Sequence, residues 1–134
     1  MYLGIDYGTK RVGLAVGSLY PRGIGTLHNP GSFVELADKI TTICKDQDVE
    51  LIIMGVPAKS DGSVGDLWHD INKFSKILCQ KTGIKVVFEE EAYTSVEAED
   101  ELHARGINTR IEKDKVDELS AVLILEQYIN KPKS

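Results

Sequence analysis

The arrangement of hydrophobic and polar residues divides the chain into a strand-rich beginning and an alternating remainder. In the first 28 residues, short apolar runs are separated by glycine-containing turns, which predicts three hairpin-linked strands. Further along, a short and wholly apolar run indicates a strand buried on both faces, and one more strand follows it. The predicted strands cover residues 3–7, 12–17, 23–28, 51–54 and 85–89.

Four segments show the helical recurrence of apolar residues at every third or fourth position. Ser32 and Glu35 form a capping box at the start of the first, and Gly83 is a stop signal after the second. The last is apolar nearly all round, which is typical of a helix packed against a sheet. One helix is predicted to begin at Ser32, and the others cover about 66–82, 94–106 and about 114–130.

The predicted order of elements, β-β-β-α-β-α-β-α-α, indicates an α/β fold. Right-handed crossovers place the two later strands parallel to the first, on its open edge. This gives a five-stranded mixed sheet in the order 3-2-1-4-5, with helices on both faces. The length of 134 residues is that of a single domain, 1–134. Ligands of such sheets collect at the carboxyl ends of the strands, where we expect Asp6 to lie.

Charge and composition narrow the class of protein. The net charge of −5 argues against a passive nucleic-acid coat, although acids gathered in a metal site would be compatible with an enzyme acting on nucleic acid. No apolar run is long enough to span a membrane, and the N-terminus lacks a basic leader, so we expect a cytoplasmic protein without a membrane partner. Cys44 and Cys79 are interpreted as reduced packing residues.

The first indication of chemistry is Asp6, a carboxylate inside an otherwise apolar strand. Burying a lone carboxylate is costly, so its position calls for a partner. The turn that follows, residues 8–11, offers backbone N–H groups and the cations Lys10 and Arg11. This combination suits either a divalent metal or a phosphate. The alternative is that Asp6 only caps the turn.

Two further groups of acids are predicted to lie at the same edge of the sheet. They are the triplet Glu89–Glu91, at the end of the last strand, and Asp117, in the first turn of the last helix. Each has a simpler explanation, as a solvated strand end or as an acid favoured by the helix dipole. Together with Asp6, however, they supply the oxygen ligands of a Mg²⁺ (or Mn²⁺) site of a phosphoryl-transfer enzyme. Two metals bridged by one carboxylate would also fit.

Basic and aromatic residues near these acids are candidates for nucleic-acid contacts. Lys10 and Arg11 either bind phosphate or simply occupy a hairpin turn. A second group, near the last helix, either follows a nucleic-acid backbone or forms a solvated face, and it comprises Arg105, Arg110, Lys113 and Lys115. Trp68 is either a base-stacking platform or a packing residue. The loop 55–65 is a candidate substrate flap.

The sequence resembles the YqgF (RuvX) family over essentially its whole length. The opening motif, residues 4–16, reads GIDYGTKRVGLAV. It is followed by Gly55-Val-Pro57 with Asp61-Gly62 and Gly65, by YTSVEAE at 93–99, and by KVDELSAVLILEQY at 115–128. Members of this family are ribonuclease H-like proteins, described as Holliday junction resolvases and as nucleases that mature the 5′ end of pre-16S rRNA. The resemblance implies that Asp6, Glu91 and Asp117 are the metal-binding catalytic acids.

One motif departs from the family pattern. Where the family has Asp-Glu-Arg, this chain has Glu90-Glu91-Ala92, so Glu90 remains a possible ligand and a phosphate-contacting or orienting Arg is missing. The resemblance implies a metal-dependent nuclease of pre-16S rRNA, with a resolvase of branched DNA as the alternative and the ribosome as a possible partner. A non-catalytic nucleic-acid-binding assembly factor is the rival from another class. A resolvase would favour a homodimer, and RNA trimming a monomer.

Overall fold

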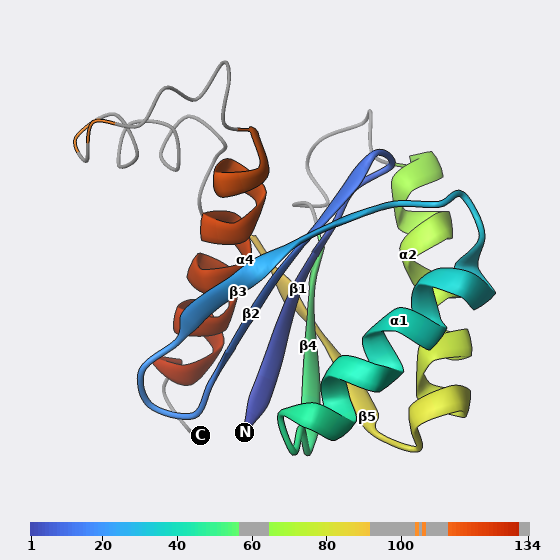
Figure 1. Ribbon diagram of the computed structural model, residues 1–134, viewed down its shortest axis with the longest axis horizontal. Helices are drawn as coiled ribbons and strands as arrows, with labels where there is room; N and C mark the ends of the chain where they lie inside the picture. Colours follow the sequence, from blue (N-terminus) through green and yellow to red (C-terminus); the bar gives the residue numbers. More distant parts are fainter. Residues whose placement is uncertain (57–64, 92–103, 105, 107–112, 132–134) are drawn as a thin grey trace.

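The computed structural model describes residues 1–56, 65–91, 104, 106 and 113–131 of the chain. Its centre is one mixed sheet of five strands in the order β3-β2-β1-β4-β5 (Figure 1). β1 pairs antiparallel with β2 and parallel with β4, so it lies at the middle of the sheet, as predicted. The strands are β1 Tyr2–Tyr7, β2 Arg11–Gly17, β3 Arg22–His28, β4 Leu51–Val56 and β5 Lys85–Glu90.

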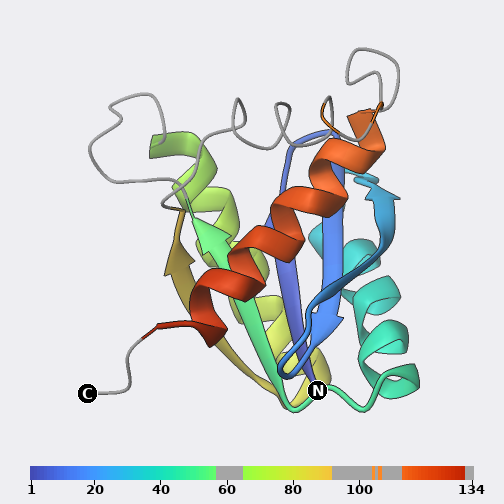
Figure 2. The same cartoon turned by 90° about the vertical axis from the view of Figure 1, so that its left-hand side faces the viewer.

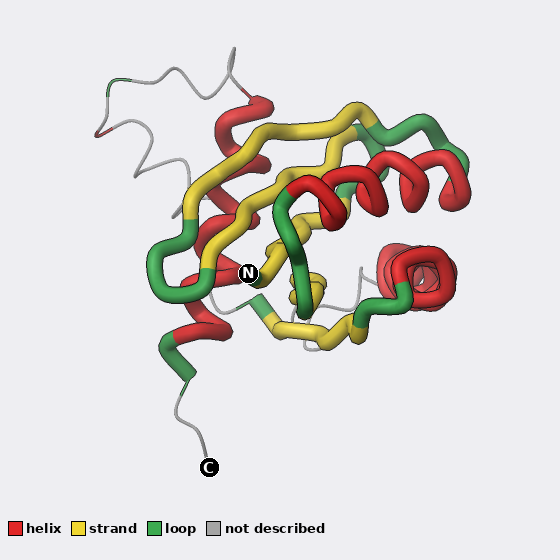
Figure 3. The backbone as a smooth tube through the Cα atoms, turned by 60° about the horizontal axis from the view of Figure 1, so that its bottom comes forward, coloured by secondary structure: helices red, strands yellow, loops and turns green. Residues whose placement is uncertain are grey.

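Helices cover both faces of this sheet. α4 (Lys113–Ile129) crosses one face, and α1 (Phe33–Asp46) and α2 (Gly65–Thr82) lie together on the other (Figures 2 and 3). The predicted helix over 94–106 lies outside the described residues, apart from Ala104 and Gly106. None of the helices described is long and apolar enough to cross a membrane.

The predicted elements agree with the observed ones within about two residues at each end. The local signals act as expected: the Ser32 hydroxyl accepts the N–H of Glu35 at 3.3 Å, and Gly83 ends α2 with a φ of +70°. β4 and β5 extend slightly further than the apolar pattern, because their ladder continues to the pair Val56 and Glu90. The α/β fold and the strand order 3-2-1-4-5 are therefore confirmed.

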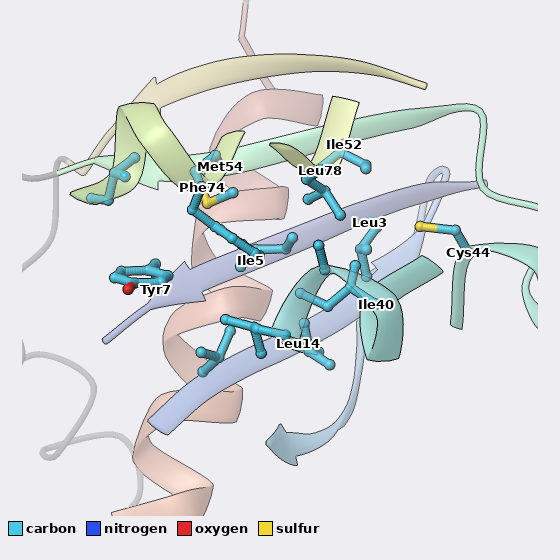
Figure 4. Packing of buried hydrophobic residues seen from close by; sticks show 14 of the residues in the cluster. Leu3, Ile5, Tyr7, Leu14, Ile40, Cys44, Ile52, Met54, Phe74 and Leu78 are labelled. Atoms are coloured by element: carbon cyan, nitrogen blue, oxygen red, sulfur yellow. The ribbon is translucent and has the colours of Figure 1, made fainter. Parts of the chain in front are cut away.

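The main core lies between the sheet and the α1–α2 pair. Leu3 and Ile5 of β1 are fully buried there against Ile40 of α1 and Phe74 of α2 (Figure 4). Cys44 belongs to this core, and burial raises the pKa of its thiol to about 11. The interpretation of Cys79 as a packing residue is wrong, because its side chain is exposed on α2.

On the opposite face, α4 approaches the sheet closely because the strands carry glycine beneath it. A Cβ atom at Gly4 would lie 2.9 Å from the carbonyl oxygen of Ala121. A Cβ atom at Gly13 would overlap the carbonyl oxygen of Asp117. Real side chains do not tolerate such distances, so these two glycines set the depth at which α4 packs. The same contact places Asp117 directly over β2.

The first prediction concerns this close approach. Gly13→Ala should lower the free energy of unfolding by about 1–3 kcal/mol or more, because its methyl group meets backbone that cannot rotate away. Gly55→Ala is the matched control, since its Cβ atom meets the end of the Ile124 side chain, which can move. Urea unfolding of both variants measures the difference, and equal losses would contradict this account.

Candidate active site

The candidate site begins at Asp6, next to last in the central strand. Leu3, Ile5 and Tyr7 face the main core, so the alternation of a strand directs Asp6 to the face covered by α4. Its partner across the ladder is Gly13, the residue that lies against Asp117. The hairpin register and the close packing of α4 therefore bring Asp6 and Asp117 to the same end of the sheet.

Glu91 reaches this point from the far side of β4. It follows β5 directly, and its N–H donates to the carbonyl of Val56 at 2.9 Å, which adds one rung to the ladder. Beside it, Gly55 has no side chain, and a Cβ atom there would lie 3.4 Å from the Glu91 carboxyl oxygen Oε1. The glutamate side chain thus passes over Gly55 and forms a hydrogen bond with Asp6.

Asp6 and Glu91 are two acids whose ionisations oppose each other. Burial is the largest cause that raises the pKa of Asp6 well above its usual value, followed by the charge of Glu91 and then that of Asp117. Burial also raises the pKa of Glu91, while its hydrogen bond with Asp6 lowers it. Both shifts act in the same direction, because burial disfavours two charged carboxylates side by side. A cation would relieve this repulsion, which is the condition that a metal site requires.

Asp117 is engaged by a different partner. The Arg11 Nε donates to its Oδ2 at 2.6 Å and lies 3.8 Å from Oδ1 of Asp114. Arg11, predicted as a phosphate contact, thus neutralises one of the predicted metal ligands. In the part of the chain that the structure describes, no three His, Cys, Asp or Glu residues are arranged as a ready metal site. The carboxylates of Asp6 and Glu91 have the chemistry that a divalent cation binds, while the Asp117 carboxylate is held by Arg11.

The three residues of the glutamate triplet lie in three different environments. Glu89 is 2% exposed, accepts from Gln127 at 2.5 Å and pairs with the Lys131 Nζ at 3.0 Å, so it anchors the end of α4. Glu90 is exposed, while Glu91 alone of the three forms the hydrogen bond with Asp6. The acidic triplet did not by itself indicate this anchor, although strand alternation separates residue 90 from 89 and 91.

The structure describes only some of the residues that were predicted to contact nucleic acid. Lys10 and Lys115 are exposed, while Arg110, Ala92 and the loop 57–64 lie outside the described residues, as does the side chain of Lys113. Trp68 packs edge-on against Phe88 at 5.6 Å, which favours the packing interpretation. Thr26 and the exposed His28, to which the sequence pattern assigned no role, lie beside Lys10 and Arg11.

Comparison with known proteins decides the family. A family model described as "RuvX: Holliday junction resolvase" matches residues 1–131. The chain belongs to the RuvX family. Curated relatives include a "Putative pre-16S rRNA nuclease" of Histophilus somni, 36% identical over 94% of this chain and 91% of that protein. Another protein of the same name, from Crocosphaera subtropica, is 32% identical over 96% of this chain and 91% of its own length.

Solved structures show that this RuvX-family chain shares the ribonuclease H-like fold of RuvC. Thermus thermophilus RuvC in complex with a Holliday junction substrate superposes with a TM-score of 0.60 at 16% identity, covering 95% of this chain and 92% of that one. The fowlpox virus resolvase, solved with Holliday junction DNA, gives a TM-score of 0.55 at 12% identity, with coverages of 97% and 99%. At these identities the likeness concerns the fold.

The raised pKa of Asp6 predicts how stability depends on pH. The folded state binds the Asp6 proton more tightly than the unfolded state, so in EDTA stability falls as pH rises from the usual carboxyl pKa through the folded one. Asp6→Asn keeps a donor to Glu91 but cannot ionise, so it should unfold at a higher temperature than wild type at pH 7. The difference should vanish near pH 4. Glu90→Gln, an exposed neighbour, is the control, and a lower melting temperature for Asp6→Asn would refute the assignment.

The Arg11–Asp117 pair predicts a competition between guanidinium and metal. Arg11→Gln frees the Asp117 carboxylate, so Mn²⁺ should bind several-fold more tightly in isothermal titration calorimetry. Lys10→Gln removes the same charge from the adjacent exposed residue and should leave the Mn²⁺ affinity close to that of wild type. Equal affinities for wild type and Arg11→Gln would mean that Arg11 does not compete with the metal for Asp117.

Proposed function

We propose that this chain is a divalent-metal-dependent endonuclease that hydrolyses phosphodiester bonds of structured nucleic acid, within one ribonuclease H-like domain. The observation that carries the proposal is the hydrogen-bonded pair of Asp6 and Glu91, with the charge of Asp117 acting on it. Three acids from a central strand, a strand end and a helix have no structural need to meet, and their mutual repulsion disfavours the fold unless a cation or a proton is shared among them.

Asp6 is proposed as the central metal ligand because both other acids act on its charge. Glu91, just after β5, and Asp117, in α4, flank it. A Mg²⁺ or Mn²⁺ ion held by these carboxylates would supply an activated water and would stabilise the charge that develops on the phosphate. Burial at the sheet end strengthens the electrostatic interactions of the acids, and Arg11 is positioned to exchange Asp117 for a phosphate oxygen.

The proposed substrate is the 5′ end of pre-16S rRNA. The support is the name of the curated relatives that match this chain along more than nine-tenths of its length. The second candidate is branched DNA, favoured by the description of the matching family model and by the junction DNA in the structures that share the fold. The two differ in the expected oligomeric state, because symmetric cuts in a junction require two active sites.

The decisive experiment measures cleavage of a pre-rRNA 5′-leader RNA, a four-way DNA junction and linear controls, each with Mg²⁺, Mn²⁺ or EDTA. Asp6→Asn should reduce cleavage by more than about 100-fold, because even groups behind the metal ligands typically account for 10–100-fold. Its nucleic-acid affinity, from fluorescence anisotropy, should stay near that of wild type. Glu90→Gln is the charge-matched control and should remain active.

The substrate that is cut in preference distinguishes RNA processing from junction resolution. If wild type and Asp6→Asn both fail to cleave every substrate but still bind nucleic acid tightly, the proposed nuclease function is wrong. The protein would then be a non-catalytic nucleic-acid-binding factor.

A further inference from the structure

A surface hollow of about 370 Å³ lies beside the acids, between the end of the β2–β3 hairpin and the start of α4. Its lining residues are Lys10, Arg11, Thr26, His28 and Asp114. Arg11 and His28 face each other across the ladder, and Thr26 shares their face of the sheet two residues further along. Arg11 also contacts Asp117, so this one side chain forms the wall between the hollow and the candidate active site.

The walls of this hollow are fixed to one another by hydrogen bonds. Asn29, just past β3, donates its backbone N–H to the carbonyl of Lys10 at 2.9 Å and its side-chain amide to that of Gly8 at 2.8 Å. The Thr26 hydroxyl donates to the Asp114 carbonyl at 2.6 Å. The turn that carries Lys10 and the first turn of α4 are therefore both tied to β3, and the hollow is a built feature of the fold.

The charges of the lining select a particular kind of ligand. Lys10 and Arg11 bring two positive charges to the lining and Asp114 one negative charge, and Arg11 also pairs with Asp117, so the lining offers a ligand chiefly the single charge of the Lys10 ammonium. Ammonium, guanidinium and imidazole groups all donate hydrogen bonds to anionic oxygens. Among the described residues, the lining includes no Phe, Tyr or Trp side chain, and the His28 imidazole is its one aromatic ring. The ligand that fits this lining is a phosphodiester, which carries one negative charge, with its attached sugar.

We propose that this hollow binds a backbone phosphate of the nucleic-acid strand that flanks the phosphate at the acids. That the bound strand belongs to the nucleic acid to be cleaved rests on the proposed function. The volume exceeds that of a phosphate group alone and lies near the lower end of ligand pockets, about 300 Å³, which leaves room for an attached sugar. A strand seated there passes Arg11 before it reaches Asp6 and Glu91. The hollow thus positions the strand by one phosphate, while the acids act on the neighbouring phosphate.

The test is binding without cleavage, measured in EDTA by fluorescence anisotropy of labelled single-stranded RNA and DNA over a series of salt concentrations. Lys10→Gln should weaken binding by about threefold to tenfold and lower the slope of log affinity against log salt by about 0.7. His28→Gln should also weaken binding. The matched control is Lys85→Gln, an exposed lysine at the opposite end of the sheet, which should behave as wild type.

Unchanged affinity and salt slope in both Lys10→Gln and His28→Gln would overturn the proposal. So would displacement of the oligonucleotide by micromolar adenosine monophosphate or inorganic phosphate, because the hollow would then be a site for free anions. This binding measurement does not depend on catalysis, because the substitutions can weaken salt-dependent binding even in a protein that never cleaves. Conversely, normal cleavage together with an unaltered salt slope would reject the hollow and leave the nuclease intact.

Discussion

The close packing of α4 on the glycine-bearing face of the sheet is the constraint on which the candidate site depends. Gly13 brings the backbone of Asp117 against β2, and Gly55 opens the path by which Glu91 reaches Asp6. A side chain at Gly13 would push the backbone of Asp117 away from β2. The glycines therefore set the distances between the acids, because they allow carboxyl groups from three parts of the chain to lie close enough to interact electrostatically.

In the resulting site, acids that repel one another lie beside basic side chains that neutralise some of them. Burial and the charges of Glu91 and Asp117 raise the pKa of Asp6, while Arg11 neutralises the charge of Asp117. Glu89 is held apart from them by Gln127 and Lys131, on the same side of β5 but further back along the strand. One strand end thus carries an acid that stabilises the fold and an acid that strains it, a division typical of functional sites.

Arg11 connects the acids to the neighbouring hollow. Its guanidinium binds Asp117 on one side and lines the hollow with Lys10 and His28 on the other. Planar guanidinium groups pair equally well with carboxylates and phosphates, so the same side chain suits both the metal-free and the substrate-bound protein.

The sequence by itself determined the strands, the described helices, their order and the sheet topology, because hydrophobic periodicity, caps and crossover handedness are local or chain-order properties. It also indicated Asp6, since an acid in an apolar strand is locally anomalous. Only the tertiary structure decided that Glu91 rather than Glu90 contacts Asp6, that Arg11 pairs with Asp117, and that Thr26 and His28 line a hollow. These outcomes depend on which side chains meet across different elements, and that is set by register and packing depth, which no local pattern encodes.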